Sequence, residues 1–181
     1  MAVTIGRFHT AKEYPISETE ALLRVFIAAL LGSALGLERE LSDKPAGLRT
    51  HMLVTEGAAL FMVASLLLAD KFGGGPNAIS LDPTRIAAGI VTGIGFLGGG
   101  AILQSHDRVK GITTAADIWV AAAIGLLVGA GFYIVAVGGV VIAVVTLAGL
   151  TFPERWLGRS DTDRYHFHRT KQDDSSPPKS E

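Results

Sequence analysis

The chain contains no cysteine and is poor in charged residues. Only 18% of its 181 residues are Asp, Glu, Lys or Arg, whereas soluble domains carry about 25%. Because cysteine is absent, disulfides, thiolate catalysis and cysteine-ligated zinc are excluded. The formal net charge of −1 also provides no basic field for nucleic acid, so nucleic acid is not an expected partner.

An apolar core of the kind found in cleavable signal peptides is missing from the N-terminal segment, residues 1–19. We therefore expect no cleavable signal peptide in this segment. The first apolar run of the chain then acts as an uncleaved insertion signal.

Long apolar runs dominate the remaining sequence, with 49% hydrophobic residues and a mean hydropathy of +0.39. A bilayer core about 30 Å thick is crossed by a helix of about 20 apolar residues. Five runs approach this length, which predicts an all-α polytopic membrane protein with a transmembrane domain over residues 20–152. The predicted spans are residues 22–37, 50–69, 86–103, 112–132 and 133–152. One span plus a re-entrant piece remains an alternative for residues 112–152.

Lys and Arg residues collect in alternate loops, which predicts the orientation. One set of loops and ends carries most of them: Arg39, Lys44, Arg49, Arg108, Lys110, Arg155 and Arg159. Since positively charged loops stay in the cytoplasm, we expect the N-terminus with residues 1–19 on the outer (periplasmic) side and the C-terminus inside. Residues 153–181 are polar, with Pro and Ser near their end, which predicts a mostly disordered cytoplasmic tail.

Glu56 and Asp117 are carboxylates inside otherwise uncharged apolar runs. A charge at the membrane centre costs about 2.5–3.5 kcal/mol on insertion scales, so such residues usually face a partner, a cavity or an ion. The two acids meet if the second and fourth spans are neighbours. Three uses stay open: sharing a proton, coordinating a divalent cation such as Mg²⁺, or hydrogen-bonded packing. Glu38, at the end of the first span, is either a third candidate ligand at an acidic entrance or part of an interfacial ion-pair network.

Glycine accounts for 22 residues and concentrates inside the spans. Spacings of four residues place small residues on one helix face, which lets helices approach closely in lipid. We expect helix packing by Gly32, Gly36, Gly89, Gly93, Gly95, Gly99, Gly125 and Gly129. So much glycine exceeds the need of one small bundle, which predicts a homodimer through the first or third span.

Other polar residues have ordinary structural interpretations. His51 is expected to be hydrogen-bonded at the interface, Asp82 to cap the third span, and Arg24 to extend toward the outer interface. No serine or histidine has a neighbouring base in an arrangement typical of hydrolases, so we expect no enzyme.

Three short motifs resemble those of the MgtC/SapB family of bacterial inner-membrane proteins. They are GLERE and KPAGLRTH at residues 36–40 and 44–51, DPTRIAA and GIGFLG at 82–88 and 93–98, and GITTAA at 111–116 followed by Trp119. The resemblance covers residues 20–152. Because only a short polar tail follows the last span, the chain is similar to the shorter, SapB-like form without a folded cytoplasmic C-terminal domain.

The resemblance implies a non-enzymatic inner-membrane protein linked to magnesium homeostasis and to adaptation to low-magnesium or host-like stress. Two alternatives stay open. One is a transporter or channel that moves Mg²⁺ or protons past Glu56 and Asp117. The other is a regulator that binds another membrane complex, such as the ATP synthase. Membrane lipid is a partner in each case, and Mg²⁺ is the one cofactor under consideration.

Overall fold

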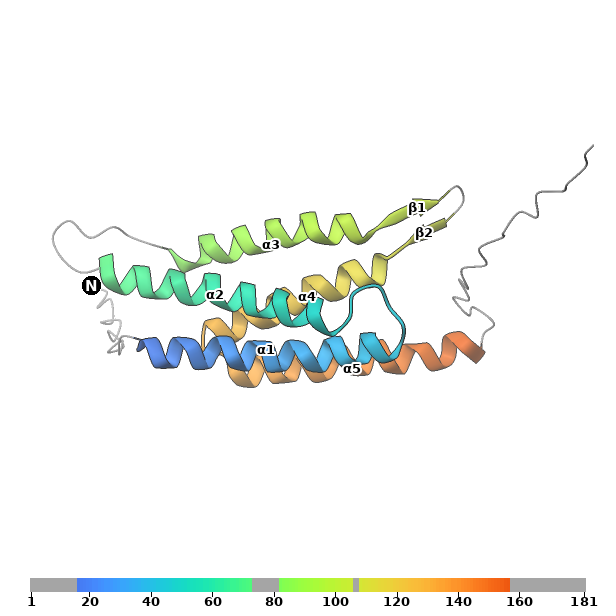
Figure 1. The fold of residues 1–181 in the computed structure, drawn as a ribbon, viewed down its shortest axis with the longest axis horizontal. Coiled ribbons are helices and arrows are strands. Elements are labelled where there is room, and N and C mark those ends of the chain that lie inside the picture. The colour runs from blue at the N-terminus through green and yellow to red at the C-terminus, as the bar shows by residue number, and fades with distance from the viewer. Residues whose placement is uncertain (1–15, 73–81, 106–107, 157–181) are drawn as a thin grey trace, which may run out of the picture.

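The chain folds into a bundle of helices in the computed structural model, which describes residues 16–72, 82–105 and 108–156. Most of the predicted N-terminal segment and of the predicted tail lies outside the described residues. In the described part, the helices are α1 (Glu18–Leu41), α2 (Leu48–Phe72), α3 (Pro83–Ala101), α4 (Ile112–Gly129) and α5 (Tyr133–Trp156). A hairpin of β1 (Leu103–Ser105) and β2 (Arg108–Lys110) connects α3 to α4 (Figure 1).

The predicted all-α polytopic architecture is confirmed. The helices of the described part occur where the spans were predicted, with ends that differ by a few residues. Three of them, α1, α2 and α4, are long and apolar enough to cross a membrane. Within α5, Tyr133–Gly149 forms a shorter apolar helix.

Local sequence signals explain where two of the helices begin. Ser17 caps α1, because its side chain accepts a hydrogen bond of 3.1 Å from the Glu20 backbone N–H. Asp82 caps α3 through a hydrogen bond of 2.9 Å from the Thr84 N–H. Pro83 occupies the first position of α3, where its missing N–H does no harm. The predicted capping role of Asp82 is therefore confirmed.

A turn at residues 130–132 separates α4 from α5. Gly131 has a φ of +89°, in the left-handed region that favours glycine. The Phe132 N–H donates a hydrogen bond of 2.8 Å to the Leu127 carbonyl, which closes the C-terminal end of α4. Residues 112–152 therefore belong to two helices, α4 and α5, and do not form the alternative of one span plus a re-entrant piece.

The hairpin differs from the sequence-based prediction, which places only a loop between the third and fourth spans. β1 and β2 pair in antiparallel orientation, with Leu103 opposite Lys110. Strands of three residues are too short to show an alternating pattern of apolar and polar residues. Gly111 follows the hairpin at a φ of +86°, and a Cβ there would overlap the Ala101 carbonyl.

Helix α4 is central and packs against each of the other four helices (Figure 1). The core consists of small and branched apolar side chains: Ala28, Leu35, Ala59, Ala121, Ile124, Val128, Ala136 and Val140. Helix α3 packs mainly against α4 and α2 and so lies at one side of the bundle. Large apolar side chains such as Phe96 and Ile134 remain exposed, as is compatible with a surface that faces lipid.

Four of the predicted packing glycines closely approach α2 or the residues just before it. They are Gly32 and Gly36 of α1 and Gly125 and Gly129 of α4. A Cβ on Gly36 of α1 would lie 2.6 Å from the Leu48 Cα. A Cβ on Gly129 of α4 would lie 2.8 Å from the Ala59 carbonyl oxygen. Larger residues at these positions would therefore push the helices apart.

The predicted packing glycines of α3 have a different environment. No atom of another element in the described part lies within 4 Å of a Cβ built on Gly89, Gly93, Gly95 or Gly99. A Cβ on Gly98, by contrast, would lie 3.5 Å from the Ala115 carbonyl oxygen of α4. Inside the described protomer, most of the α3 glycines thus have no helix partner.

Candidate functional site

A group of charged and polar side chains is buried where α1, α2 and α4 meet. It consists of Arg39 from α1, His51 from α2, and Thr114 and Asp117 from α4, and we call it the Asp117 cluster. The exposed fractions of the side chains are 4% for Arg39, 0% for His51 and 2% for Asp117. The ionisable groups of the cluster are thus closed off from the surroundings of the protomer.

The carboxylate of Asp117 is the centre of the cluster. Its Oδ2 lies 2.7 Å from His51 Nε2 and 3.3 Å from Arg39 Nε. Arg39 Nη2 also donates a hydrogen bond of 3.0 Å to Thr114 Oγ1. Because a buried charge is costly unless it is paired, these contacts explain how Asp117 is accommodated inside an apolar bundle.

The other ring nitrogen of His51 is engaged as well. Nδ1 lies 2.9 Å from the Gly47 carbonyl oxygen, one helical turn earlier in the chain. The Leu48 N–H, the first of α2, donates a hydrogen bond of 2.9 Å to Glu40 Oε2 of α1. The loop between α1 and α2 is therefore tied to both helices, and it fixes the position of the His51 ring.

Small residues allow the three helices to approach closely enough to form the cluster. Thr55, one turn after His51, donates a hydrogen bond of 3.0 Å to the His51 carbonyl. The same threonine faces Gly32 of α1 and Gly125 of α4, and a Cβ on either glycine would overlap one of its atoms. These small residues therefore position the cluster as well as packing the core.

Glu56 has a different environment from Asp117. It lies five residues after His51 on α2, which corresponds to a rotation of about 140° around the helix axis. Its side chain is partly buried, and it forms no hydrogen bond or ion pair with another residue of the described ranges. The structure pairs Asp117 with His51 and Arg39.

Glu38 lies one residue before Arg39 and has its own contacts. Its Oε1 accepts a hydrogen bond of 3.0 Å from Ser42 Oγ, and its Oε2 is buried without a hydrogen-bond partner among the described residues. Within the described ranges, no group of three or more His, Cys, Asp or Glu side chains is placed to hold a metal ion. Arg39 and His51 both contact Oδ2 of Asp117, so this oxygen of the carboxylate is already engaged.

Sequence reasoning places Arg39 among the basic residues of the loops and span ends and misses its contact with α4. The helical spacing contains the missing signal, since Arg39 lies seven residues after Gly32 and three after Gly36, on the buried face of α1. The predicted hydrogen bonding of His51 is present, and the residue is also completely buried.

A second buried arginine, Arg24, lies at the opposite end of α1. Its Nη1 donates a hydrogen bond of 2.8 Å to the Gly129 carbonyl, and its Nε lies 3.2 Å from Glu20 Oε1. The side chain of Arg24 is only 10% exposed, so it packs against α4, a contact that the sequence-based prediction does not include. Free carbonyl groups at the C-terminal end of α4 attract a cation, so the guanidinium packs inward.

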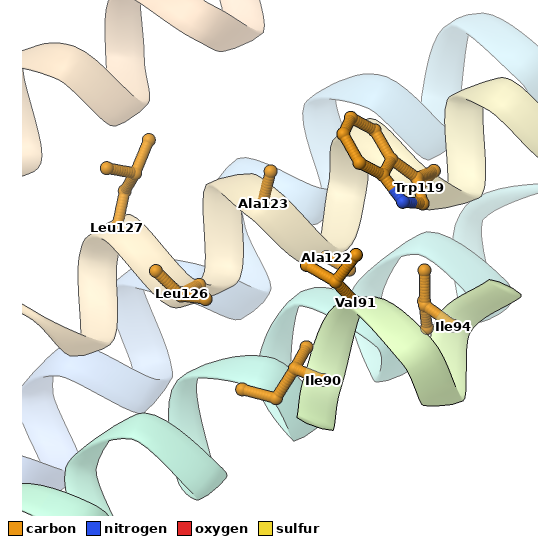
Figure 2. Close-up of a pocket in the computed structure, with 8 residues that line it drawn as sticks. All are labelled: Ile90, Val91, Ile94, Trp119, Ala122, Ala123, Leu126 and Leu127. Atoms are coloured by element: carbon orange, nitrogen blue, oxygen red, sulfur yellow. The ribbon is translucent and has the colours of Figure 1, made fainter. Parts of the chain in front are cut away.

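A cavity lies between α3 and α4 (Figure 2). It has a volume of ≈ 240 Å³ and an apolar lining that includes Ile90 and Ile94 of α3 and Trp119 and Leu126 of α4. None of its lining residues in the described part is ionisable. The cavity therefore offers hydrophobic contact but no group that would bind an ion.

Comparison with known proteins agrees with the resemblance carried by the motifs. The model of the MgtC family matches residues 25–156, which contain the whole Asp117 cluster. No solved structure matches the chain.

Curated relatives are similar over most of this chain. YhiD of Escherichia coli strain K12, named as a candidate magnesium transporter, is 45% identical over 83% of this chain and 68% of YhiD. SapB of Bacillus subtilis is 38% identical over 78% of this chain and 61% of SapB. MgtC of Brucella abortus is 45% identical over 65% of this chain and 44% of MgtC, so the relatives extend beyond the matched part. The resemblance is thereby confirmed, and the chain belongs to the MgtC family.

Proposed function

We propose that this chain is a non-enzymatic, multi-pass protein of the bacterial inner membrane that supports magnesium homeostasis and growth when magnesium is limiting. The observation that carries the proposal is the 45% identity, over 83% of this chain, to YhiD, whose name refers to magnesium transport. Membership of the MgtC family and the apolar helices α1, α2 and α4 support the membrane location.

The proposed orientation has the N-terminus outside and the C-terminus inside. In Figure 1 the α1–α2 loop, the hairpin and the end of α5 lie at the same end of the bundle. These segments contain Lys44, Lys110 and Arg155, among other basic residues. Their gathering at one end supports a cytoplasmic position for that end and for the nearby Asp117 cluster.

A second candidate function is a transporter or channel that moves Mg²⁺ or protons. The buried ionisable groups of the Asp117 cluster favour it, because such groups inside membrane spans usually mark ion pathways or proton relays. A bundle of this size provides few helices for a pathway, so this function requires an assembly of protomers. Purified protein in liposomes that shows neither Mg²⁺ nor proton flux, beside a working control transporter, would contradict it.

A homodimer is part of the proposal. Gly89 and Gly93 of α3 face no other helix within the described protomer, and small residues of this kind allow a second copy to approach closely. Gly93→Leu is expected to reduce cross-linking of two copies in native membranes. Gly138→Leu on α5, where the position is equally open in the described part, is the matched control. A monomer both in native membranes and by light scattering in detergent would contradict the dimer.

Growth in limiting magnesium tests the proposed function. A strain of the source bacterium without the gene is expected to grow more slowly than its parent in this medium and equally well with ample magnesium. The full-length gene should restore growth, whereas Asp117→Asn should not, at equal accumulation by immunoblot. Asp70→Asn removes an exposed carboxylate at the other end of α2 and is the matched control. Normal growth of the deletion strain in limiting magnesium would contradict the proposal.

A further inference from the structure

Both ring nitrogens of His51 face hydrogen-bond acceptors. Nδ1 lies 2.9 Å from the Gly47 carbonyl oxygen, and Nε2 lies 2.7 Å from Asp117 Oδ2. A neutral imidazole has one N–H donor and one lone pair. With a neutral ring and an ionised carboxylate, one of the two contacts would place a lone pair against a lone pair. The two contacts are satisfied together only if the His51–Asp117 pair holds one additional proton.

The additional proton has two positions on the shared contact. It lies on Nε2, which then donates to Asp117 Oδ2, or on Oδ2, which then donates to the lone pair of Nε2. In both arrangements the Nδ1–H donates to the Gly47 carbonyl. Arg39, a permanently charged group with its Nε 3.3 Å from Oδ2, stays beside the carboxyl group in both.

Few other charges act on this pair. The charged groups whose fields reach His51 are Asp117 of α4 and Arg39 of α1. Residues 86–101 of α3 and 134–149 of α5 contain no ionisable side chain. The remaining ionisable residues toward this end of the described chain are Glu38, Glu40, Asp43, Lys44, Arg49, Glu56, Arg108, Lys110, Glu154 and Arg155.

We propose that the Asp117 cluster is a proton-binding site whose ligand is one H⁺ shared between His51 Nε2 and Asp117 Oδ2. With the proton bound, the cluster has one net positive charge, and without it the cluster is neutral. The site goes beyond the proposed function, because the geometry requires it whether or not the chain serves magnesium homeostasis.

Loss of the proton breaks one of the two contacts of the His51 ring. The remaining N–H donates either to Asp117 Oδ2 or to the Gly47 carbonyl, and lone pairs then face each other at the other contact, so the ring or its helix has to move. His51 lies in the first turn of α2, directly after the α1–α2 loop, and the movement is expected at this end of the bundle. The site thereby links proton binding to helix packing.

Nitrogen-15 NMR of the full-length protein in lipid bilayers tests the proposal. All histidines are labelled, and the His51 signals are those that disappear in His51→Gln. At pH 7.5 an ordinary histidine is about one tenth protonated. We expect instead either a fully protonated His51 ring or a neutral ring beside a protonated Asp117 carboxyl group, which carbon-13 labelling of aspartate distinguishes. A neutral ring beside an ionised Asp117 carboxylate overturns the proposal.

Two substitutions assign the proton to the shared contact. Asp117→Asn should abolish it, leaving a neutral His51 ring and no protonated carboxyl signal. Glu56→Gln removes the other carboxylate of the spans and should leave both signals unchanged. A fully protonated ring that persists in Asp117→Asn, or a proton that is lost in Glu56→Gln, contradicts the assignment. If Asp117→Asn does not accumulate, the spectrum of the parent protein decides.

Discussion

The two ends of α1 each bury an arginine against α4, but the partners differ. Arg24 donates to the backbone carbonyl of Gly129 and pairs with Glu20, whose side chain is 45% exposed. Arg39 pairs with Asp117 and lies in the same closed cluster as His51. One end is thus a helix cap in contact with its surroundings, and the other is an enclosed set of ionisable side chains.

The antiparallel arrangement of α1 and α4 explains the difference. Arg24 meets the C-terminal end of α4, where free carbonyl groups carry a partial negative charge. Arg39 meets the N-terminal part of α4, which offers no free carbonyl groups, and its partner there is the Asp117 carboxylate. The same residue type therefore has a structural role at one end of the helix and a candidate functional role at the other.

Asp117→Ala tests the closed end and should have the largest effect. It leaves the Arg39 guanidinium charged and unpaired inside the bundle, which lowers the free energy of unfolding by about 3–5 kcal/mol. Unfolding in mixed detergent micelles measures the loss. Glu56→Ala, at an acid with no partner among the described residues, is the control and should change stability by less than about 1 kcal/mol. Equal losses for the two variants would contradict the description of a closed cluster.

Arg24→Ala tests the capped end and should have an intermediate effect. The Gly129 carbonyl loses its charged donor but remains near the end of the bundle, so we expect a loss of about 1–3 kcal/mol. The same unfolding assay applies, with Arg85→Ala, an exposed arginine on α3, expected to stay within about 0.5 kcal/mol of the parent. A loss as large as that of Asp117→Ala would remove the contrast between the two ends.

Glu20→Gln separates the ion pair from the cap at the Arg24 end. Because the Glu20 side chain is half-exposed, the pair should contribute only about 0–1 kcal/mol, and less at high salt. Unfolding measured at low and high ionic strength checks both statements. A loss greater than that of Arg24→Ala would mean that the carboxylate, and not the Gly129 carbonyl, holds the guanidinium in place.

Acid should loosen the start of α3, which lies at the same end of the bundle as the start of α1, with the smallest effect (Figure 1). Hydrogen bonds from Thr84 lower the pKa of Asp82 below its ordinary value of 3.8. The stabilisation by this cap is therefore complete above pH 3.8 and is lost as the pH falls through the lowered pKa. Hydrogen exchange in the first turn of α3 should rise over that range in the parent. Asp82→Asn cannot ionise and should show no such pH dependence.

Hydropathy was sufficient to predict the helices and their membrane character. Runs of about 20 apolar residues specify spans because a helix satisfies its own backbone hydrogen bonds in lipid. Asp117 could also be singled out in advance, since a carboxylate within an apolar run is costly without a partner. The motifs at residues 36–51, 82–98 and 111–116 were sufficient for the family.

Only the tertiary structure decided what Asp117 is paired with. His51 is 66 residues away from it in the chain, and Arg39 is 75 residues away from Thr114, so these side chains meet only when α1, α2 and α4 pack together. The glycines give the same lesson, because Gly93 and Gly125 both belong to four-residue spacings, yet in the described protomer only Gly125 lies against another helix. A spacing in the sequence specifies one face of a helix, whereas the partner of that face depends on how the helices are arranged in three dimensions.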